Sequence, residues 1–290
     1  MRAEALEKCK LMAAMALFGT IGLFVRRIGL PSGLIVFVRS VVGMLFLLGV
    51  LLLRRKKPDF AAIWKHGLLL LLSGACLGVN WILLFEAYRY TTVATATLCY
   101  YLAPVLVMLA APLLLKERLT LRRALCAVAA LGGMVLVSGI LSSGEFSPKG
   151  IVLGLGAAVF YAGLILLNRR LGALDAFDKT IAQLFVAALV VLPYTLLAES
   201  WSFSDFGGVT VILLLIVGIL HTGIAYCLYF GAVGRLKAQT AAILSYLDPV
   251  VAVLLSALVL KEPLGMGGVL GSVFILGAAL ISELPEKRKE

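Results

Sequence analysis

Apolar stretches long enough to cross a bilayer dominate this chain. A transmembrane helix needs about 20 consecutive apolar residues. Breaks at charge clusters and at Gly, Pro and Ser turns divide the chain into ten such segments, residues 11–30, 33–53, 66–88, 93–115, 121–141, 149–168, 178–198, 208–230, 238–260 and 264–284. The sequence therefore predicts an all-α polytopic membrane protein with ten transmembrane helices.

The composition argues against a soluble enzyme. Hydrophobic residues make up 62% of the 290 residues and charged residues 14%, whereas soluble domains are about 45–50% apolar and about 25% charged. The sequence contains no phosphate-binding loop, zinc-protease motif or nucleophile elbow, and its five cysteines form no C-x-x-C pair. We therefore expect no enzymatic activity, no cofactor and no metal site, and any transport must be passive or driven by an ion gradient.

The net charge of +11 is better explained by membrane orientation than by nucleic-acid binding. Lys and Arg concentrate in the cytoplasmic loops of membrane proteins. If both termini are cytoplasmic, 20 basic residues lie in cytoplasmic segments and five on the other side. The prediction is a multi-pass protein of the cytoplasmic (inner) membrane, with both termini inside and no nucleic-acid partner.

Two stretches of the chain are copies of each other. Residues 85–119 and 230–264 align without a gap at an offset of 145, and 14 of the 35 positions are identical. The shared residues include Tyr101 with Tyr246 and Pro104 with Pro249. We therefore divide the chain into repeats 1–144 and 145–290. Five spans per repeat is an odd number, so the second repeat should be inverted relative to the first, as in many secondary transporters with a site between the repeats.

These features together resemble a known family. The 5+5 layout, the Tyr-Leu-x-Pro-Val segment of both copies and the L-K-E-x-L ends of segments 93–115 and 238–260 are similar to the EamA branch of the drug/metabolite transporter superfamily. The resemblance implies a secondary transporter with a central cavity, peripheral fifth and tenth helices and alternating access. It also implies a small polar or amphipathic substrate of the amino acid, amine or nucleobase class, moved outward. The alternative is a non-transporting membrane scaffold or sensor with the same fold.

Ionisable groups within spans usually mark function, because they are costly to bury in lipid. His221 and Asp248 lie at similar depth near the midplane. They are predicted to couple transport to protons or to bind a cationic or amine substrate. The alternatives are a fixed hydrogen-bonded pair between the two helices, or two groups that never meet.

Arg39 and Glu86 both fall in the outer part of the membrane and are predicted to pair as an outer gate. Glu86 could instead pair with Arg89. Arg39 could instead extend its long side chain to the outer interface.

Aromatic and polar side chains complete the predicted site, since small-molecule sites are mostly apolar and aromatic with few polar groups. The predicted substrate-binding residues are Asn80, Trp81, Tyr101, Tyr161, His221, Tyr226, Tyr246 and Asp248. Trp81 has helix packing as its alternative. Pro104 and Pro249 are expected within helices as matched hinges. A Gly-x-x-x-Gly pair at Gly267 and Gly271 is compatible with a homodimer or with internal packing.

Overall fold

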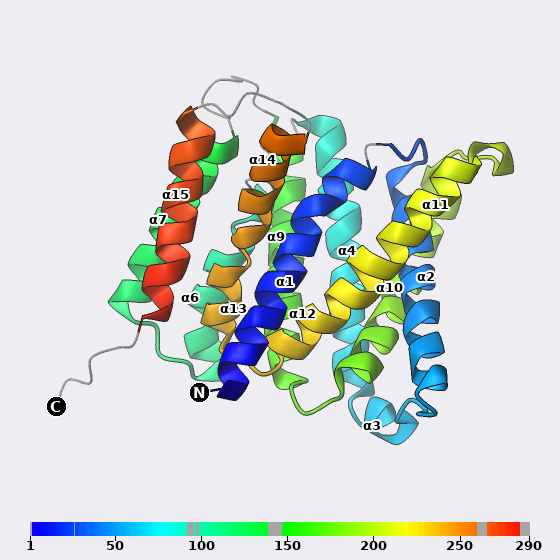
Figure 1. Cartoon of the computed structure of the whole chain (residues 1–290), viewed down its shortest axis with the longest axis horizontal. Coiled ribbons are helices and arrows are strands. Elements are labelled where there is room, and N and C mark those ends of the chain that lie inside the picture. The colour runs from blue at the N-terminus through cyan, green and yellow to red at the C-terminus, as the bar shows by residue number, and fades with distance from the viewer. Residues whose placement is uncertain are drawn as a thin grey trace.

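The computed structural model describes residues 2–25, 27–91, 96, 99–138, 147–259 and 266–284, and these form helices and connecting turns with no strand among them (Figure 1). The first half of the chain forms α1 (Arg2–Val25), α2 (Ser32–Leu53), α3 (Phe60–Lys65), α4 (Gly67–Tyr90), α6 (Ala103–Leu115) and α7 (Leu121–Ser138). The second half forms α9 (Pro148–Arg170), α10 (Ala176–Ala198), the 3-10 turn η1 (Phe203–Asp205), α11 (Gly208–Ile216), the π-helix η2 (Val217–Ile224), α12 (Ala225–Val233), α13 (Ala238–Leu244), α14 (Leu247–Val259) and α15 (Met266–Glu283).

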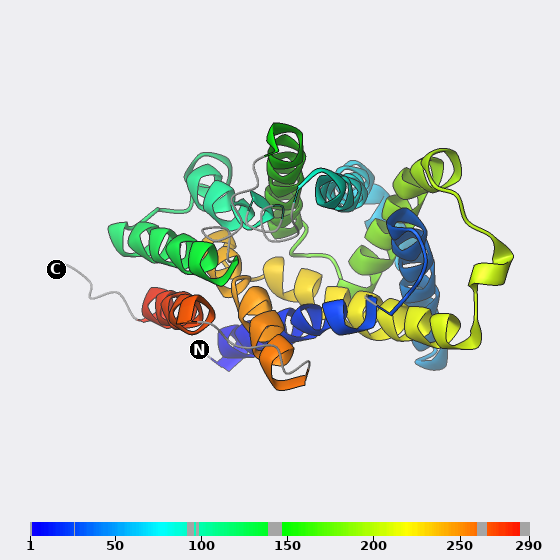
Figure 2. The same ribbon diagram turned by 90° about the horizontal axis from the view of Figure 1, so that it is seen from above.

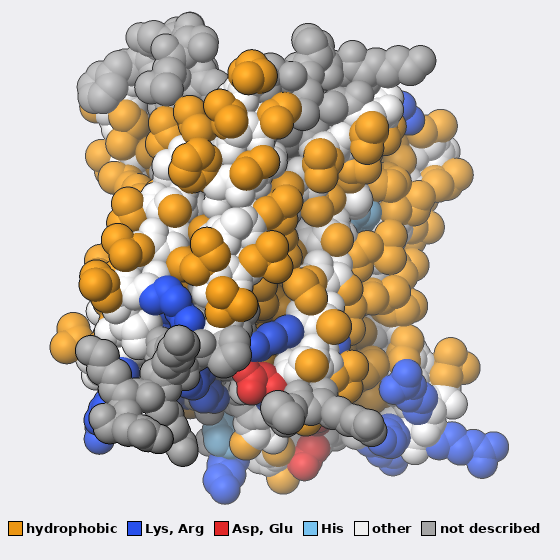
Figure 3. Space-filling view, turned by 60° about the vertical axis from the view of Figure 1, so that its left-hand side comes forward, with side chains coloured by type: hydrophobic (Ala, Val, Ile, Leu, Met, Phe, Trp, Pro, Cys, Tyr) orange, Lys and Arg blue, Asp and Glu red, His pale blue; other side chains and the backbone are white. Residues whose placement is uncertain are grey.

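Six helical stretches of the described chain are long and apolar enough to cross a membrane, so the protein is a multi-pass membrane protein. They are Ala3–Val25, Ser32–Leu53, Gly67–Ala87, Pro148–Arg170, Ala176–Ala198 and Gly208–Val233. The surface agrees, because apolar side chains cover the body of the face in Figure 3 while Lys and Arg gather toward one end. We call this the basic end; α1 begins and α15 ends there (Figure 1).

Helix α1 begins at Arg2, nine residues before the predicted span at residue 11. The polar residues of this first part are good helix formers, and ion pairs Lys8–Glu4 and Lys10–Glu7 link neighbouring turns. A span estimated from apolar residues alone misses such a polar extension.

Both copies of the repeated stretch are interrupted where a continuous helix was expected. A turn at Tyr101 and Leu102 precedes α6, and a turn at Ser245 and Tyr246 separates α13 from α14. Pro104 therefore lies at the start of α6, and Pro249 lies in the first turn of α14. Proline is tolerated there because the first-turn N–H groups have no intrahelical partner. The prediction that these prolines bend helix interiors is wrong.

Each half of the chain packs mainly against the other (Figure 2). Helix α4 lies against α9 and α10, α2 against α10 and η2, and α1 against α12 and α14. Helix α6 contacts α9, and α7 and α15 form a separate pair. The large core cluster accordingly draws buried residues from both halves.

The glycines of α15 allow this helix to pack closely against α7 of the same chain. A Cβ on Gly267 would meet the carbonyl oxygen of Leu136 at 2.8 Å, and one on Gly133 would meet that of Gly271 at 2.7 Å. Both contacts join α15 to α7, so the Gly-x-x-x-Gly pair serves internal packing, and the homodimer stays a prediction without this support.

Candidate functional site

The two helix breaks lie side by side in the interior of the protein, where Tyr101 and Tyr246 are buried. The Tyr246 hydroxyl donates to the Tyr101 carbonyl oxygen at 3.0 Å, and the two rings are 6.1 Å apart. The repeat predicted that these tyrosines would occupy related positions, and the structure places them in direct contact. A carbonyl at a helix break is open to such a side-chain donor.

Asp248 is held at this junction. Its Oδ2 accepts a 2.7 Å hydrogen bond from the Tyr101 hydroxyl, the one described donor to this carboxylate. Helix α1 passes so close that a Cβ on Gly19 would meet the Asp248 carbonyl oxygen at 2.7 Å. Since a carboxylate has about four lone-pair sites and the structure describes one donor to this one, Asp248 keeps capacity to accept further hydrogen bonds.

Aromatic rings run from this junction into the second half of the chain. Tyr100 lies against Tyr101 and stacks on Tyr161 with 5.0 Å between ring centroids. The Tyr229 hydroxyl donates to the Tyr161 hydroxyl at 3.0 Å. The rings then continue through Tyr226, which contacts Tyr229, Phe18 and Trp81. We call this set the aromatic cluster: Phe18, Trp81, Tyr100, Tyr101, Tyr161, Tyr226, Tyr229 and Tyr246.

Arg39 lies at the other end of the aromatic cluster. Its guanidinium carbon is 4.7 Å from the centre of the Trp81 ring, and its Nε donates to Thr222 Oγ1 at 2.9 Å. The side chain is only 5% exposed and forms no ion pair with any residue the structure describes. In this conformation the Arg39 side chain neither extends to the membrane interface nor pairs with Glu86, so both predictions for it are wrong. Trp81 packs between helices and also contacts the Arg39 cation.

The π-helix η2 positions the partner of Arg39. The Thr222 hydroxyl donates to the Val217 carbonyl five residues earlier, at 2.9 Å. Such π segments occur often at functional sites. The apolar sequence of the segment gives no sign of it, although Gly218 and Gly223 both lie in this stretch and pack closely on α2.

Gly43 of α2 lies directly against the backbone of η2, and we expect Gly43→Ala to lower thermal stability. An added Cβ would meet the Gly218 carbonyl oxygen at 2.9 Å and the Gly223 nitrogen at 3.0 Å. Both are backbone atoms, so the helices must separate, at a cost of about 1–3 kcal/mol. The measurement is the melting temperature of the purified protein in detergent.

Gly49→Ala on the same helix is the matched control. A Cβ at Gly49 meets nothing within 4 Å, and Ala is a better helix former than Gly. The control should melt at the same or a slightly higher temperature. Equal melting of the two variants would contradict the tight contact.

His221 and Asp248 have different partners. His221 Nε2 lies 2.7 Å from Thr20 Oγ1, whose proton is directed to the Leu17 carbonyl at 2.7 Å. Thr20 must therefore accept, and the His221 Nε2 carries a proton. The imidazole is fully buried and ties η2 to α1. His221 and Asp248 therefore do not form the hydrogen-bonded pair between helices that was one alternative. The structure agrees with the other alternative, in which the two side chains do not meet.

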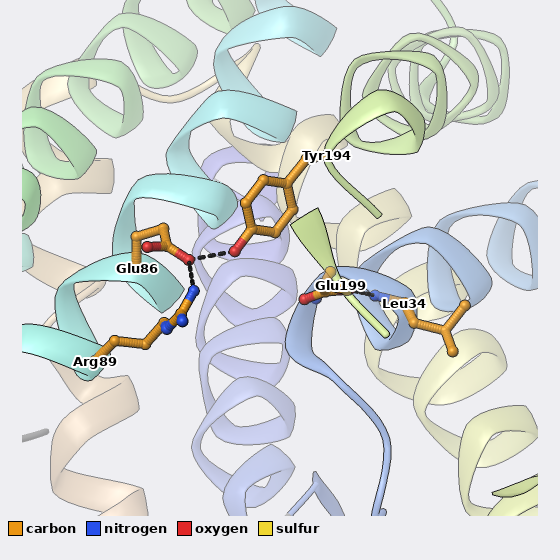
Figure 4. A network of polar contacts seen from close by, with 6 residues as sticks. Leu34, Glu86, Arg89, Tyr194 and Glu199 are labelled. Carbon is orange, nitrogen blue, oxygen red and sulfur yellow. Dashed lines mark hydrogen bonds and ion pairs between the residues drawn. The ribbon is translucent and has the colours of Figure 1, made fainter. Parts of the chain in front are cut away.

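Glu86 takes part in a network at the end of the protein away from the basic end (Figure 4). It accepts from Arg89 at 3.0 Å and from the Tyr194 hydroxyl of α10. Beside it, Glu199 accepts from the backbone N–H groups of Gly33 at 2.7 Å and Leu34 at 2.9 Å. A carboxylate is favourable at the start of a helix, so these contacts fasten α10 to α4 and α2.

Asn80 serves helix packing. It is 1% exposed, and its amide nitrogen donates to the Ala157 carbonyl at 2.8 Å, which joins α4 to α9. Among the described residues, no three His, Cys, Asp or Glu side chains gather in a way that could hold a metal ion.

The sequence reasoning missed an ion-pair network at the basic end. Glu7 Oε1 lies 3.0 Å from Arg235 and 3.0 Å from Lys10. Glu117 Oε1 lies 3.5 Å from Arg169 and accepts from the Ala238 N–H at 3.1 Å. Both carboxylates are largely buried, and each joins the first half of the chain to the second. Glu7 fell outside the predicted span, and Glu117 was noted only for its place in the repeat.

Comparisons with known proteins place the chain among membrane transporters. The model of the EamA-like transporter family matches residues 8–139 and again residues 148–283. The uncharacterized transporter YxxF of Bacillus subtilis is 32% identical over 85% of this chain and 79% of its own length. Protein PecM of Dickeya dadantii is 28% identical over 80% of this chain and 77% of its own length. One solved crystal structure shares the fold with a TM-score of 0.87 over 97% of both chains, at 21% identity.

Proposed function

The chain belongs to the EamA-like transporter family, and we propose that it is a secondary transporter for small metabolites that carry an amine group. The observation that carries this proposal is Asp248, an acidic residue within a membrane-embedded helix whose carboxylate has one described hydrogen-bond donor, beside an aromatic cluster. The substrate-binding residues are then Asp248 with Tyr101, Tyr161, Tyr226, Tyr246 and Trp81.

An amine suits this chemistry. An ammonium group forms charge-assisted hydrogen bonds with a carboxylate and is attracted to the faces of aromatic rings. The rings also provide the apolar wall that an amphipathic substrate needs. Because Arg39 supplies a cation at the far end of the cluster, amino acids whose amine and carboxylate are well separated also fall within the proposed range, with their carboxylate toward Arg39.

The helix contacts support two inverted repeats, residues 1–144 and 145–290, with ten spans. Under inversion each contact between the halves should have a counterpart. Helix α1 packs on α14 as α9 packs on α6, and α1 packs on α12 as α9 packs on α4. Likewise α2 packs on η2 as α10 packs on α4. The family model also matches the chain twice.

We propose that the protein works by alternating access, as transporters built from inverted repeats do. The ion pairs of Glu7 and Glu117 close the basic end between the halves. We infer that the basic end is cytoplasmic, as the positive-inside rule implies, that both termini lie there in the cytoplasmic membrane, and that substrate moves outward. Asp248 is the proposed site of proton coupling. In this mechanism His221 has a positioning role through Thr20.

The test is solute counterflow in proteoliposomes. Purified protein is reconstituted and preloaded with a panel of amines and amino acids, and neutral and acidic compounds of similar size serve as controls. We expect accumulation of labelled amines or amino acids and none of the acidic compounds. Movement of acidic compounds alone would contradict the amine proposal. No movement of any compound by folded protein would favour a scaffold or sensor.

A further inference from the structure

An apolar groove opens on the membrane-facing surface between α2, α3, α4 and α10. Its volume is about 760 Å³, within the range of about 300–1,000 Å³ typical of small-molecule sites. The lining is apolar almost throughout and includes Met44, Leu48, Ile63, Leu68, Leu71 and Phe185. The aromatic cluster contributes no residue to it, so the groove is separate from the proposed substrate site.

Helix α3 forms the rim of the groove at the basic end (Figure 1). The Asp59 carboxylate caps this helix by accepting from the Ala62 N–H at 2.9 Å. Two aromatic side chains of α3 stand out from the protein, Phe60 at 71% and Trp64 at 89% exposed. Exposed Trp on a short helix beside a transmembrane span is typical of the headgroup region of a bilayer.

A basic segment borders the same rim. Arg54 lies over the Phe177 ring at 5.2 Å, which holds the end of α2 next to α10. The exposed side chains of Arg55, Lys56, Lys57 and Lys65 form no ion pair with any residue the structure describes. Two carboxylates at this rim have partners of their own: Asp59 caps α3, and Asp178 accepts from the Asp59 N–H at 3.3 Å.

We propose that this groove binds an anionic phospholipid. The acyl chain lies along the apolar walls, and the phosphate lies at the rim among Arg55, Lys56 and Lys57. Lipid is the apolar molecule that surrounds a multi-pass protein, and basic side chains next to a membrane attract anionic headgroups. Such a lipid contacts α2 and α4 of the first half and α10 of the second, and so joins the two halves of the chain.

Fluorescence of Trp64 tests the proposal. The chain has three tryptophans, so a Trp81→Phe and Trp201→Phe background leaves Trp64 as the single reporter. The full-length protein is placed in phosphatidylcholine nanodiscs, and brominated phosphatidylglycerol or brominated phosphatidylcholine is included over the same series of mole fractions. We expect half-maximal quenching of Trp64 by the anionic lipid at a mole fraction roughly fivefold lower than that needed for the zwitterionic lipid.

Lys56→Gln with Lys57→Gln should bring the two quenching curves together. The matched control, Arg118→Gln with Lys237→Gln, removes two exposed positive charges at other loops and should keep the preference. Ala182→Leu adds bulk to the wall of the groove and should weaken quenching of Trp64 by the anionic lipid. Gel filtration shows whether each variant remains folded. Equal quenching of the starting protein by both lipids would overturn the proposal, and so would a preference that survives the loss of Lys56 and Lys57.

Discussion

Asp248→Asn should reduce amine counterflow by roughly 10- to 100-fold and leave the protein folded. A hydrogen bond to a charged group is worth about 1.5–3 kcal/mol, and each 1.4 kcal/mol is about a factor of ten. Asn has nearly the same shape, and its amide oxygen can still accept from the Tyr101 hydroxyl that lies 2.7 Å from the carboxylate. The measurement is the initial rate of counterflow of labelled amines in proteoliposomes.

Two further variants separate charge from geometry. Asp248→Glu keeps the negative charge and should retain more transport than Asp248→Asn. Tyr101→Phe removes the one described donor to the carboxylate but leaves its charge, so the loss should be smaller than for Asn. Wild-type amine transport by Asp248→Asn, in protein that elutes and melts normally, would remove Asp248 from the binding site.

The sequence predicted the features that depend on long apolar runs and on the repeat. The family, the membrane-embedded helical fold and the pairing of Tyr101 with Tyr246 followed from these patterns. The alignment was informative about this pair because equivalent residues of two repeated stretches meet when those stretches pack against each other. One of the residues that differ between the copies, Asp248 against Ala103, also lies at the junction of the breaks.

The sequence did not predict which way the polar residues face or where the helices break. His221 and Asp248 were paired because their depths agree, yet spans that are apolar on all sides carry no signal of direction. His221 turned out to bond Thr20. The turns at Tyr101 and Tyr246 lie inside continuous apolar runs, and hydropathy records how a residue partitions into lipid rather than whether its backbone continues a helix.

Removing both carboxylates of the basic-end network, with Glu7→Gln and Glu117→Gln, should open that end of the protein. Each carboxylate joins the two halves, through Arg235 at 3.0 Å and Arg169 at 3.5 Å. Gln retains the size and some hydrogen bonding of Glu but not its charge. Because the basic partners are partly exposed, each bridge is worth only about 0.7 kcal/mol. The two together, about 1.4 kcal/mol, should shift the closed-to-open ratio by roughly tenfold.

A cysteine probe can detect this opening. In a background without the five native cysteines, Met15→Cys places a thiol on α1 where the native side chain is 1% exposed. A membrane-impermeant maleimide applied from the basic end should label it roughly tenfold faster when both glutamates are replaced, if labelling follows the open population.

Glu4→Gln is the matched control. It breaks the Lys8–Glu4 ion pair, which lies within α1 and links α1 to no other helix. The labelling rate of this control should equal that of the parent protein with both glutamates in place. Loss of a charge on α1 should open the basic end only if that charge held the two halves together. The same slow rate in the Glu7 and Glu117 double variant would show that packing of the apolar core, rather than these ion pairs, keeps the basic end closed.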